Sequence, residues 1–408
     1  MSAVKTVKIA YRVLSREGWK PLFILILERL LGDFHSVSHV KTVDALDVVF
    51  NSPPAHLAMP VTVNEGPVHI AWIMSPPGET SGGHHNLFRF IDFAEKAGHT
   101  CTIYFYSNHV TKIDIAEIRK MMAKSNAFPH LQAEMFEYSR DDGVSSSVQA
   151  IFATGWETAY PAFLDKSLAR RLYFVQDFEP YFYPVGSESV LAENTYKFGF
   201  EAITAGGWLA HKLSTEYGMK ASHFDFGVEH NRYFRTNNND RKEIFFYARP
   251  VTARRGFELG VMALEEFSKL RPDIEINMAG WDVSSRDLPF AFNNLGGVDI
   301  SHLNEIYNRC AAGLVISMTN MSLLPLELMA AGAAPVVNDA PNNRMVADSP
   351  FIQYVAPTPG DLARALVRVV EDPSAVDKSR EMSLSLSQTT WESSGAQFVV
   401  EFERTMRG

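Results

Sequence analysis

The chain has 408 residues, of which 46% are hydrophobic and 21% charged, and this composition predicts two or three globular domains. It excludes a disordered, collagen-like or disulfide-rich protein. The 38 basic and 47 acidic residues give a formal net charge of −9, which argues against a nucleic-acid partner. Cys101 and Cys310 lie far apart and outside any CxxC motif or Cys/His cluster, so we predict packed thiols, a reducing compartment and no structural zinc.

Residues 1–65 form an N-terminal extension with a basic amphipathic helical pattern. One helical face carries apolar side chains and the adjacent face basic ones, namely Val4, Val7, Tyr11 and Leu14 beside Lys5, Lys8, Arg12 and Arg16. Membrane-surface anchors show this pattern, and so do helices that pack on the protein itself or on a second subunit in a homodimer. Both interpretations stay open.

The nearest candidate for a membrane span is the apolar run 22–27, which Glu28 and Arg29 end. It is too short to cross a bilayer or to act as a secretory signal. We therefore expect a cytoplasmic protein, peripheral at the inner face of the membrane if residues 1–34 bind anionic lipid.

From residue 66 onward, short apolar runs alternate with amphipathic segments. Strands are predicted at 68–74, 102–106, 132–138, 150–154, 171–176, 202–205 and 222–226, and helices at 86–97 and 208–217. This alternation predicts a parallel sheet covered by helices, and we assign a first Rossmann-like domain to 66–238. At the boundary with the next domain, residues 235–242 are polar and lack apolar periodicity, which indicates an exposed connector.

The alternation restarts after the connector, so we assign a second Rossmann-like domain to 239–386. Strands are predicted at 243–247, 274–278, 313–317 and 334–338, and helices at 256–270, 303–311 and 325–331. Residues 387–408 begin with a capping box, Thr389 and Glu392, and should form a final helix that packs back on the first domain. The predicted fold class is α/β, with two doubly wound domains facing a cleft where the carboxyl ends of the strands bind ligands.

The first candidate site is Ser81-Gly82-Gly83-His84-His85, between a predicted strand and helix. Paired glycines there let backbone N–H groups approach a phosphate at the helix N-terminus, and a flexible loop is the alternative. No carboxylate lies nearby in sequence to complete a metal site with His84 and His85. No GxGxxG fingerprint with a following acidic residue occurs, which argues against a nicotinamide-dependent dehydrogenase.

Two further candidate sites lie in the second domain. Arg249 and Arg255 flank a strand-to-helix turn, where two guanidinium groups can clamp a diphosphate and neutralise a leaving group. For Arg254 we expect an ordinary surface role. Glu327 is the one acid of a short apolar helix that follows Ser322-Leu323-Leu324, and it needs a partner such as a pair of sugar hydroxyls. A solvated helix face is the alternative.

In this order the segments resemble the GT-B glycosyltransferases, specifically the large retaining family 4. The resemblance runs from about residue 66 to the C-terminus and rests on Gly82-Gly83, 226–229, Tyr233-Phe234, Arg249, Arg255-Gly256, 303–307, Glu327 and 330–336. Residues 152–184 are most similar to the rhamnosyltransferases that build bacterial surface polysaccharides and S-layer glycans.

The resemblance implies a glycosyltransferase that moves rhamnose from dTDP-rhamnose onto a glycan or lipid-linked glycan. It implies that the first domain binds the acceptor and the second the nucleotide-sugar donor, with Glu327 on the nucleotide ribose. The predicted donor contacts are Gly82, Gly83, Arg249, Arg255, Ser322, Leu323, Leu324 and Glu327. The predicted acceptor contacts are His84, His85, Trp156 and Glu179.

The chain departs from this family at three positions, one of which, Arg255 in place of a lysine before the glycine, keeps the charge. Thr319 stands where the first glutamate of the usual pair contacts the transferred sugar, and Asp177 stands where a histidine often follows the strand. We predict that Asp177 is catalytic together with Arg249 and Arg255, and that it positions the sugar or takes the acceptor proton. No Asp-x-Asp motif occurs, so we expect no metal and no cofactor. A nucleotide-sugar epimerase and a non-catalytic sugar-binding scaffold remain as alternatives.

Overall fold

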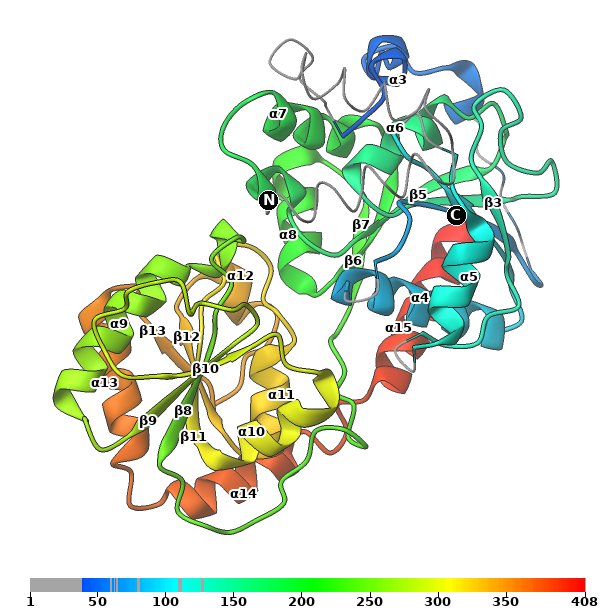
Figure 1. Cartoon of the computed structure of the whole chain (residues 1–408). Helices are drawn as coiled ribbons and strands as arrows, with labels where there is room; N and C mark the ends of the chain where they lie inside the picture. The colour runs from blue at the N-terminus through cyan, green and yellow to red at the C-terminus, as the bar shows by residue number, and fades with distance from the viewer. Residues whose placement is uncertain are drawn as a thin grey trace.

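The computed structural model describes residues 39–58, 61, 63, 65–78, 81–108, 112–125 and 128–407. Over these residues the chain forms two α/β domains, each with a parallel sheet between helices (Figure 1). The predicted fold class is therefore confirmed. The predicted basic helix within residues 1–34 lies outside the described residues. Within the described ranges, no helix is both long enough and apolar enough to cross a membrane.

The first sheet has the strand order β3-β2-β1-β4-β5-β6-β7, and all its pairings are parallel. Its strands are β1 (His69–Met74), β2 (Thr100–Phe105), β3 (Glu134–Glu137), β4 (Ala150–Ala153), β5 (Arg170–Val175), β6 (Glu201–Ala205) and β7 (Ala221–Phe224). Central strands such as β4 and β5 are buried along their whole length because helices cover both faces. The order reverses between β1 and β4, which is where a doubly wound sheet binds its ligands.

Helices cover the two faces of this sheet in separate groups. The helices are α3 (Thr42–Asp47), α4 (Gly82–Lys96), α5 (Ile115–Ala123), α6 (Trp156–Leu164), α7 (Ser187–Asn194) and α8 (Gly207–Tyr217), with 3-10 turns η1 (Ala55–Ala58), η2 (Glu179–Phe182) and η3 (Thr195–Lys197). Trp72 and Phe174 lie in the core under α4, and Ile73 and Tyr173 lie in the core under α6. Because α4 begins at Gly82, the predicted glycine loop is the first turn of a helix, and the prediction of a helix start at residue 86 was wrong.

The second sheet has the strand order β10-β9-β8-β11-β12-β13. Its strands are β8 (Glu243–Tyr247), β9 (Glu275–Ala279), β10 (Asn293–Gly296), β11 (Cys310–Val315), β12 (Ala334–Asn338) and β13 (Gln353–Val355). The covering elements are α9 (Phe257–Leu270), α10 (Leu303–Arg309), α11 (Leu324–Ala331), α12 (Pro341–Arg344), α13 (Pro359–Val370) and α14 (Ala375–Ser385), with 3-10 turns η4 (Ala253–Arg255) and η5 (Ile300–His302). Sequence periodicity missed β10 and β13, which are short strands at the two edges of this sheet.

The last helix, α15 (Trp391–Arg407), lies against the first domain (Figure 1). Gly395 permits this close packing, because a Cβ there would lie 2.4 Å from the Phe93 ring of α4. Phe398 packs among the aromatic side chains of the core under α4, which includes Trp72 and Phe174. The helix is capped by Thr390, whose Oγ1 accepts a hydrogen bond from the Ser393 N–H at 3.1 Å, so the predicted cap at Thr389 was one residue early.

The polar connector between the domains, residues 235–242, is hydrogen-bonded to the second domain. The Thr236 N–H donates to Asn308 Oδ1 at 2.8 Å, and Asn308 Nδ2 donates to the Phe234 carbonyl at 2.9 Å. Arg235 Nε donates to Ser379 Oγ at 3.0 Å. Residues 236, 238–240 and 242 are nevertheless exposed, so the expectation of an exposed connector is confirmed, and these polar bonds dock it on the second domain.

Candidate active site

The carboxyl edges of the two sheets meet at Asp177, which follows β5. Its Oδ2 accepts a hydrogen bond from Thr319 Oγ1 at 3.0 Å, and its Oδ1 accepts one from the Asn320 N–H at 2.8 Å. Oδ1 also accepts from the Phe178 N–H at 2.9 Å, and Arg254 Nε lies 3.3 Å from Oδ2. These four partners occupy the carboxylate, so the geometry favours a positioning role for Asp177 over acceptance of a proton.

Asn320 makes a second link between the domains. Its Nδ2 donates to the carbonyls of Gln176 at 3.0 Å and Ala205 at 2.7 Å, at the ends of β5 and β6. The loop that carries Asn320 is held by buried asparagines of the second domain, because Asn338 Oδ1 accepts from the Ser317 N–H at 2.8 Å and Asn342 donates to the Ser317 carbonyl at 3.0 Å. Sequence analysis missed this network, although several asparagines just after a predicted strand were a usable signal.

Three arginines gather beside this loop. Arg255 Nη1 donates to Ser317 Oγ at 2.7 Å, and Arg249 Nη1 donates to the Gly280 carbonyl at 3.4 Å. Burial lowers the pKa of Arg255, and Arg249 and Arg254 lower it further, whereas Asp177 opposes the shift. Arg254 lies over the Phe182 ring at 4.0 Å, so its predicted role as a surface residue was wrong.

Gly256 allows α9 to begin close to the end of β11. Its φ is +55°, and a Cβ there would lie 2.5 Å from Ile316 Cγ2. Only glycine fits this left-handed position without displacing the strand end. The close approach brings Arg255, the preceding residue, against Ser317.

Helix α11 follows the loop that carries Thr319 and Asn320. Ser322 and Leu323 precede it, Leu324 is its first residue, and among the described residues no side chain caps its N-terminus. Backbone N–H groups at an uncapped helix start, together with the helix dipole, favour an anion.

Glu327 lies in the first turn of α11, among charged groups of both domains. Burial raises its pKa to about 7, and Glu229 adds to this effect, while Arg232, the Tyr307 hydroxyl and Arg89 oppose it. Glu229 is itself paired with Arg89 and, at 2.7 Å, with Arg232. Glu327 therefore lies beside a charged cluster at the domain interface, which argues against the alternative of a solvated helix face.

The glycine-histidine segment opens α4 beside the end of β5. The Gly83 carbonyl accepts a hydrogen bond from Gln176 Nε2 at 3.1 Å, and Gly82 precedes it in the first turn. His84 Nδ1 lies 2.8 Å from Ser81 Oγ and its Nε2 3.1 Å from the Ser75 carbonyl. The carbonyl can only accept, so Nε2 carries the proton, and burial lowers the pKa of His84.

The other three predicted acceptor residues face protein groups. His85 packs edge-on against Phe128, with ring centroids 4.6 Å apart. The Trp156 side chain is only 2% exposed, and its backbone N–H donates to Glu179 Oε2 at 2.6 Å. Because Glu179 is buried and accepts at the start of α6, direct acceptor contacts by Trp156 and Glu179 are not supported.

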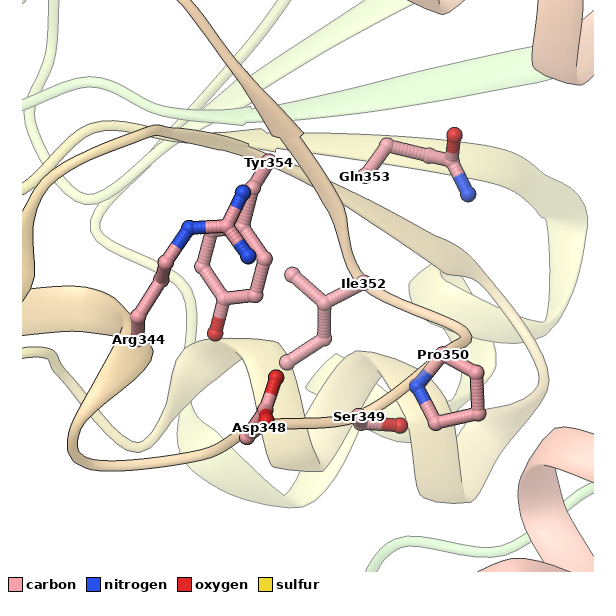
Figure 2. A pocket seen from close by; sticks show the side chains of 7 residues that line it. All are labelled: Arg344, Asp348, Ser349, Pro350, Ile352, Gln353 and Tyr354. Carbon is pink, nitrogen blue, oxygen red and sulfur yellow. The ribbon is translucent and has the colours of Figure 1, made fainter.

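The described residues also show features away from this interface. They contain no group of three His, Cys, Asp or Glu side chains that could hold a metal ion. An open hollow of about 510 Å³ lies beside β13, and Figure 2 shows the side chains that line it: Arg344, Asp348, Ser349, Pro350, Ile352, Gln353 and Tyr354. Arg344 lies over the Tyr354 ring at 4.6 Å and forms an ion pair with Asp339, so its charge is already paired. The residues that line the hollow do not include Arg249, Arg254 or Arg255.

Two Rossmann-like domains that meet at the carboxyl edges of their sheets define the GT-B fold. Residues 144–205 match the family model described as "WsaF, N-terminal domain", and residues 242–367 match "WsaF, C-terminal domain". The chain is 28% identical over 414 residues to the O-antigen biosynthesis protein RfbC of Myxococcus xanthus, covering 98% of this chain. It spans about a third of that relative, 32% of its length.

Solved structures show the same fold at low sequence identity. A glycosyltransferase from Rickettsia africae has a TM-score of 0.60 and 13% identity, covering 84% of this chain and 99% of its own. Anabaena Alr3699/HepE, solved with UDP and glucose, has a TM-score of 0.60 and 12% identity, covering 82% of this chain and 99% of its own. At this level of sequence identity, the two similarities show a shared fold only.

Proposed function

We propose that this chain is a glycosyltransferase that takes its sugar from a nucleoside diphosphate. The cluster of Arg249, Arg254 and Arg255 carries the proposal. Asp177 is the carboxylate that faces Arg254 and Arg255, so the cluster retains an excess of positive charge that suits a diphosphate. The same charge stabilises the diphosphate as it departs, when its negative charge increases.

The matches to known proteins support this activity and a role in surface glycans. One WsaF domain match lies in each domain, at residues 144–205 and 242–367, and the similar Myxococcus protein is named for O-antigen biosynthesis. The Anabaena structure of the same fold holds UDP and glucose. We infer that the acceptor is a glycan, free or lipid-linked, in the assembly of such a polysaccharide.

For the donor we propose dTDP-rhamnose. The resemblance of residues 152–184 to rhamnosyltransferases supports it. Thr319, in the place of a glutamate that would bind sugar hydroxyls, donates its hydroxyl to Asp177, and a deoxy sugar with fewer hydroxyls is compatible with this change. Glu327 would accept hydrogen bonds from the ribose of the nucleotide.

The mechanism we propose needs no divalent cation. Arg249 and Arg255 would hold the diphosphate oxygens, and the N–H groups around Ser322, Leu323 and Leu324 would meet the same charge from the start of α11. Asp177 would keep Arg254 and Thr319 in place between the two domains.

The direct test is transfer from dTDP-rhamnose to a synthetic alkyl rhamnoside, followed by mass spectrometry. We expect a product heavier by one deoxyhexose and an equal amount of thymidine diphosphate. Arg364→Ala, a matched loss of an exposed arginine on α13, should keep the wild-type rate. If the donor is isomerised without an acceptor, the protein is an epimerase; if nucleotides bind and no donor in a panel is consumed, it is a scaffold.

A further inference from the structure

A second acidic cluster lies in the first domain, at the carboxyl edge of the sheet that carries Asp177. Glu157 follows β4, and Glu179 follows β5, the neighbouring strand. The Glu179 carboxyl group interacts electrostatically with both Glu157 and Asp177. Asp177 in turn pairs with Arg254. The carboxyl groups of Asp177, Glu179 and Glu157 therefore form a row that begins at the arginine cluster and continues into the first domain.

Glu179 is the enclosed member of this row. Its Oε2 accepts hydrogen bonds from the Trp156 N–H at 2.6 Å and from the Tyr173 hydroxyl at 2.9 Å. Its residue is 8% exposed, so its carboxyl is out of reach of a glycan. Burial raises the pKa of Glu179, and the nearby Glu157 raises it further.

Glu157 lies nearer to solvent, since its residue is only partly buried. Its carboxylate folds back over Gly155, where a Cβ would lie 2.8 Å from Oε2, and it accepts a hydrogen bond from the Ser75 hydroxyl. Ser75 is held in turn by His84, whose Nε2 donates to the Ser75 carbonyl. The glycine at 155 thus gives the carboxylate a fixed position at the sheet edge.

The groups that face Glu157 come from several elements. Burial raises the pKa of Glu157, and His39, which precedes α3, opposes this effect. The acidic neighbour is Glu179, and the phenols of Tyr106 and Tyr183 also interact with Glu157. Because each carboxyl disfavours ionisation of the other, the pKa of both groups is raised and the two titrate together as a pair.

We propose that Glu157 is the base that takes the proton of the acceptor hydroxyl, with Glu179 behind it. This inference rests on the proposed transferase function and adds a catalytic residue to it. The acceptor oxygen forms its bond to the anomeric carbon of the donor as its proton passes to Glu157. The bond from that carbon to the diphosphate oxygen breaks, and its electron pair leaves with the nucleoside diphosphate toward the arginines. Glu157 then returns the proton to solvent.

The test is Glu157→Gln, which keeps size and removes the base. We expect kcat for transfer to fall at least about 100-fold, the range that a general base contributes, with thymidine diphosphate affinity within twofold of wild type. Because the pKa of Glu157 is raised, wild-type kcat should fall as pH decreases through that pKa. In Glu157→Gln, kcat should no longer show this decrease at low pH.

Glu157→Ala should regain activity with added formate, whereas a purely structural role would give no rescue.

Glu305→Gln is the matched control, since it makes the same change on α10, at a side chain that is 73% exposed and away from Glu157 and His39. It should keep the wild-type pH profile. A kcat within threefold of wild type in Glu157→Gln, or an unchanged pH profile, would overturn the assignment of Glu157. If wild-type protein binds no thymidine diphosphate and transfers no sugar, the proposed function itself fails, and the two failures are thereby distinguished.

Discussion

Asp177 and Thr319, which belong to different domains, share a hydrogen bond of 3.0 Å. Each residue departs from the family that the sequence resembles, and the two departures meet at one point in the structure. A glutamate at 319 would place a second carboxylate against Asp177, and the two charges would repel each other. The threonine hydroxyl donates instead, so the two residues are compatible as a pair.

The Asp177–Thr319 bond should contribute measurably to stability. We expect Asp177→Ala to lower the free energy of unfolding by about 1–3 kcal/mol, because it leaves the Asn320 N–H and the Arg254 guanidinium without their partner. Combined with Thr319→Val in a double-mutant cycle, it should show a coupling energy of about 1 kcal/mol in urea denaturation. Asp287→Ala, an exposed loop carboxylate, is the control. Strictly additive effects would show that the hydrogen bond contributes nothing.

Arg249 should be needed for turnover. Its truncation removes one guanidinium from the group that would meet the leaving diphosphate, so Arg249→Ala should lower kcat/KM at least about 100-fold. Arg364→Ala serves as the control. Activity should be unchanged in EDTA. A rate for Arg249→Ala within a few-fold of wild type would refute the clamp, and loss of activity in EDTA that magnesium restores would refute metal independence.

Glu327 should make the stability of the ligand-free protein depend on pH. Its pKa rises from 4.5 to about 7 on folding because burial disfavours the charged form. The folded state therefore binds the proton more tightly, and this contribution is complete below pH 4.5 and lost as pH rises to about 7. Relative to Glu327→Gln, the wild type should lose up to about 3 kcal/mol across this window in urea titrations.

The control for this pH effect is Glu305→Gln on α10, where the side chain is 73% exposed. Its stability should follow the wild-type pH dependence. A pH dependence of Glu327→Gln that equals that of the wild type would show that Glu327 titrates normally.

Residues 1–34 should decide whether the chain binds anionic membranes. Four basic side chains beside an apolar stripe favour an anionic surface by about 1 kcal/mol per charge. Deletion of 1–34 should reduce co-sedimentation with vesicles of phosphatidylglycerol and phosphatidylcholine, and high salt should do the same. Replacing Lys5, Lys8, Arg12 and Arg16 with glutamine is the matched variant. If the full chain ignores these vesicles, the segment does not serve as a lipid anchor.

Apolar periodicity located the strands of the first sheet to within two residues of their observed bounds. The strand prediction succeeded because helices cover both faces of central strands such as β5, so that their sequences are continuous apolar runs. It failed at the start of α4, where Gly82 and Gly83 have low helix propensity and the helix forms through packing of its apolar face.

The candidate site was predicted in part, since Arg249 and Arg255 follow a recognisable strand. The contact of Arg254 with Phe182 was missed because the residues are far apart in sequence and meet only where the domains touch. Trp156 and Glu179 were predicted as acceptor contacts from the resemblance of residues 152–184 to rhamnosyltransferases. In the structure they bond each other below the surface, which no local pattern shows.

The central claim is that the arginine cluster and Glu327 form a nucleoside-diphosphate site, and calorimetry tests it most directly. Thymidine diphosphate should bind at least as tightly as uridine diphosphate, and Arg249→Ala should weaken both. Glu327→Gln should weaken uridine diphosphate more, because thymidine diphosphate lacks the 2′-hydroxyl and offers Glu327 one ribose partner fewer. Failure of both nucleotides to bind wild-type protein, or binding that neither variant alters, would contradict the account.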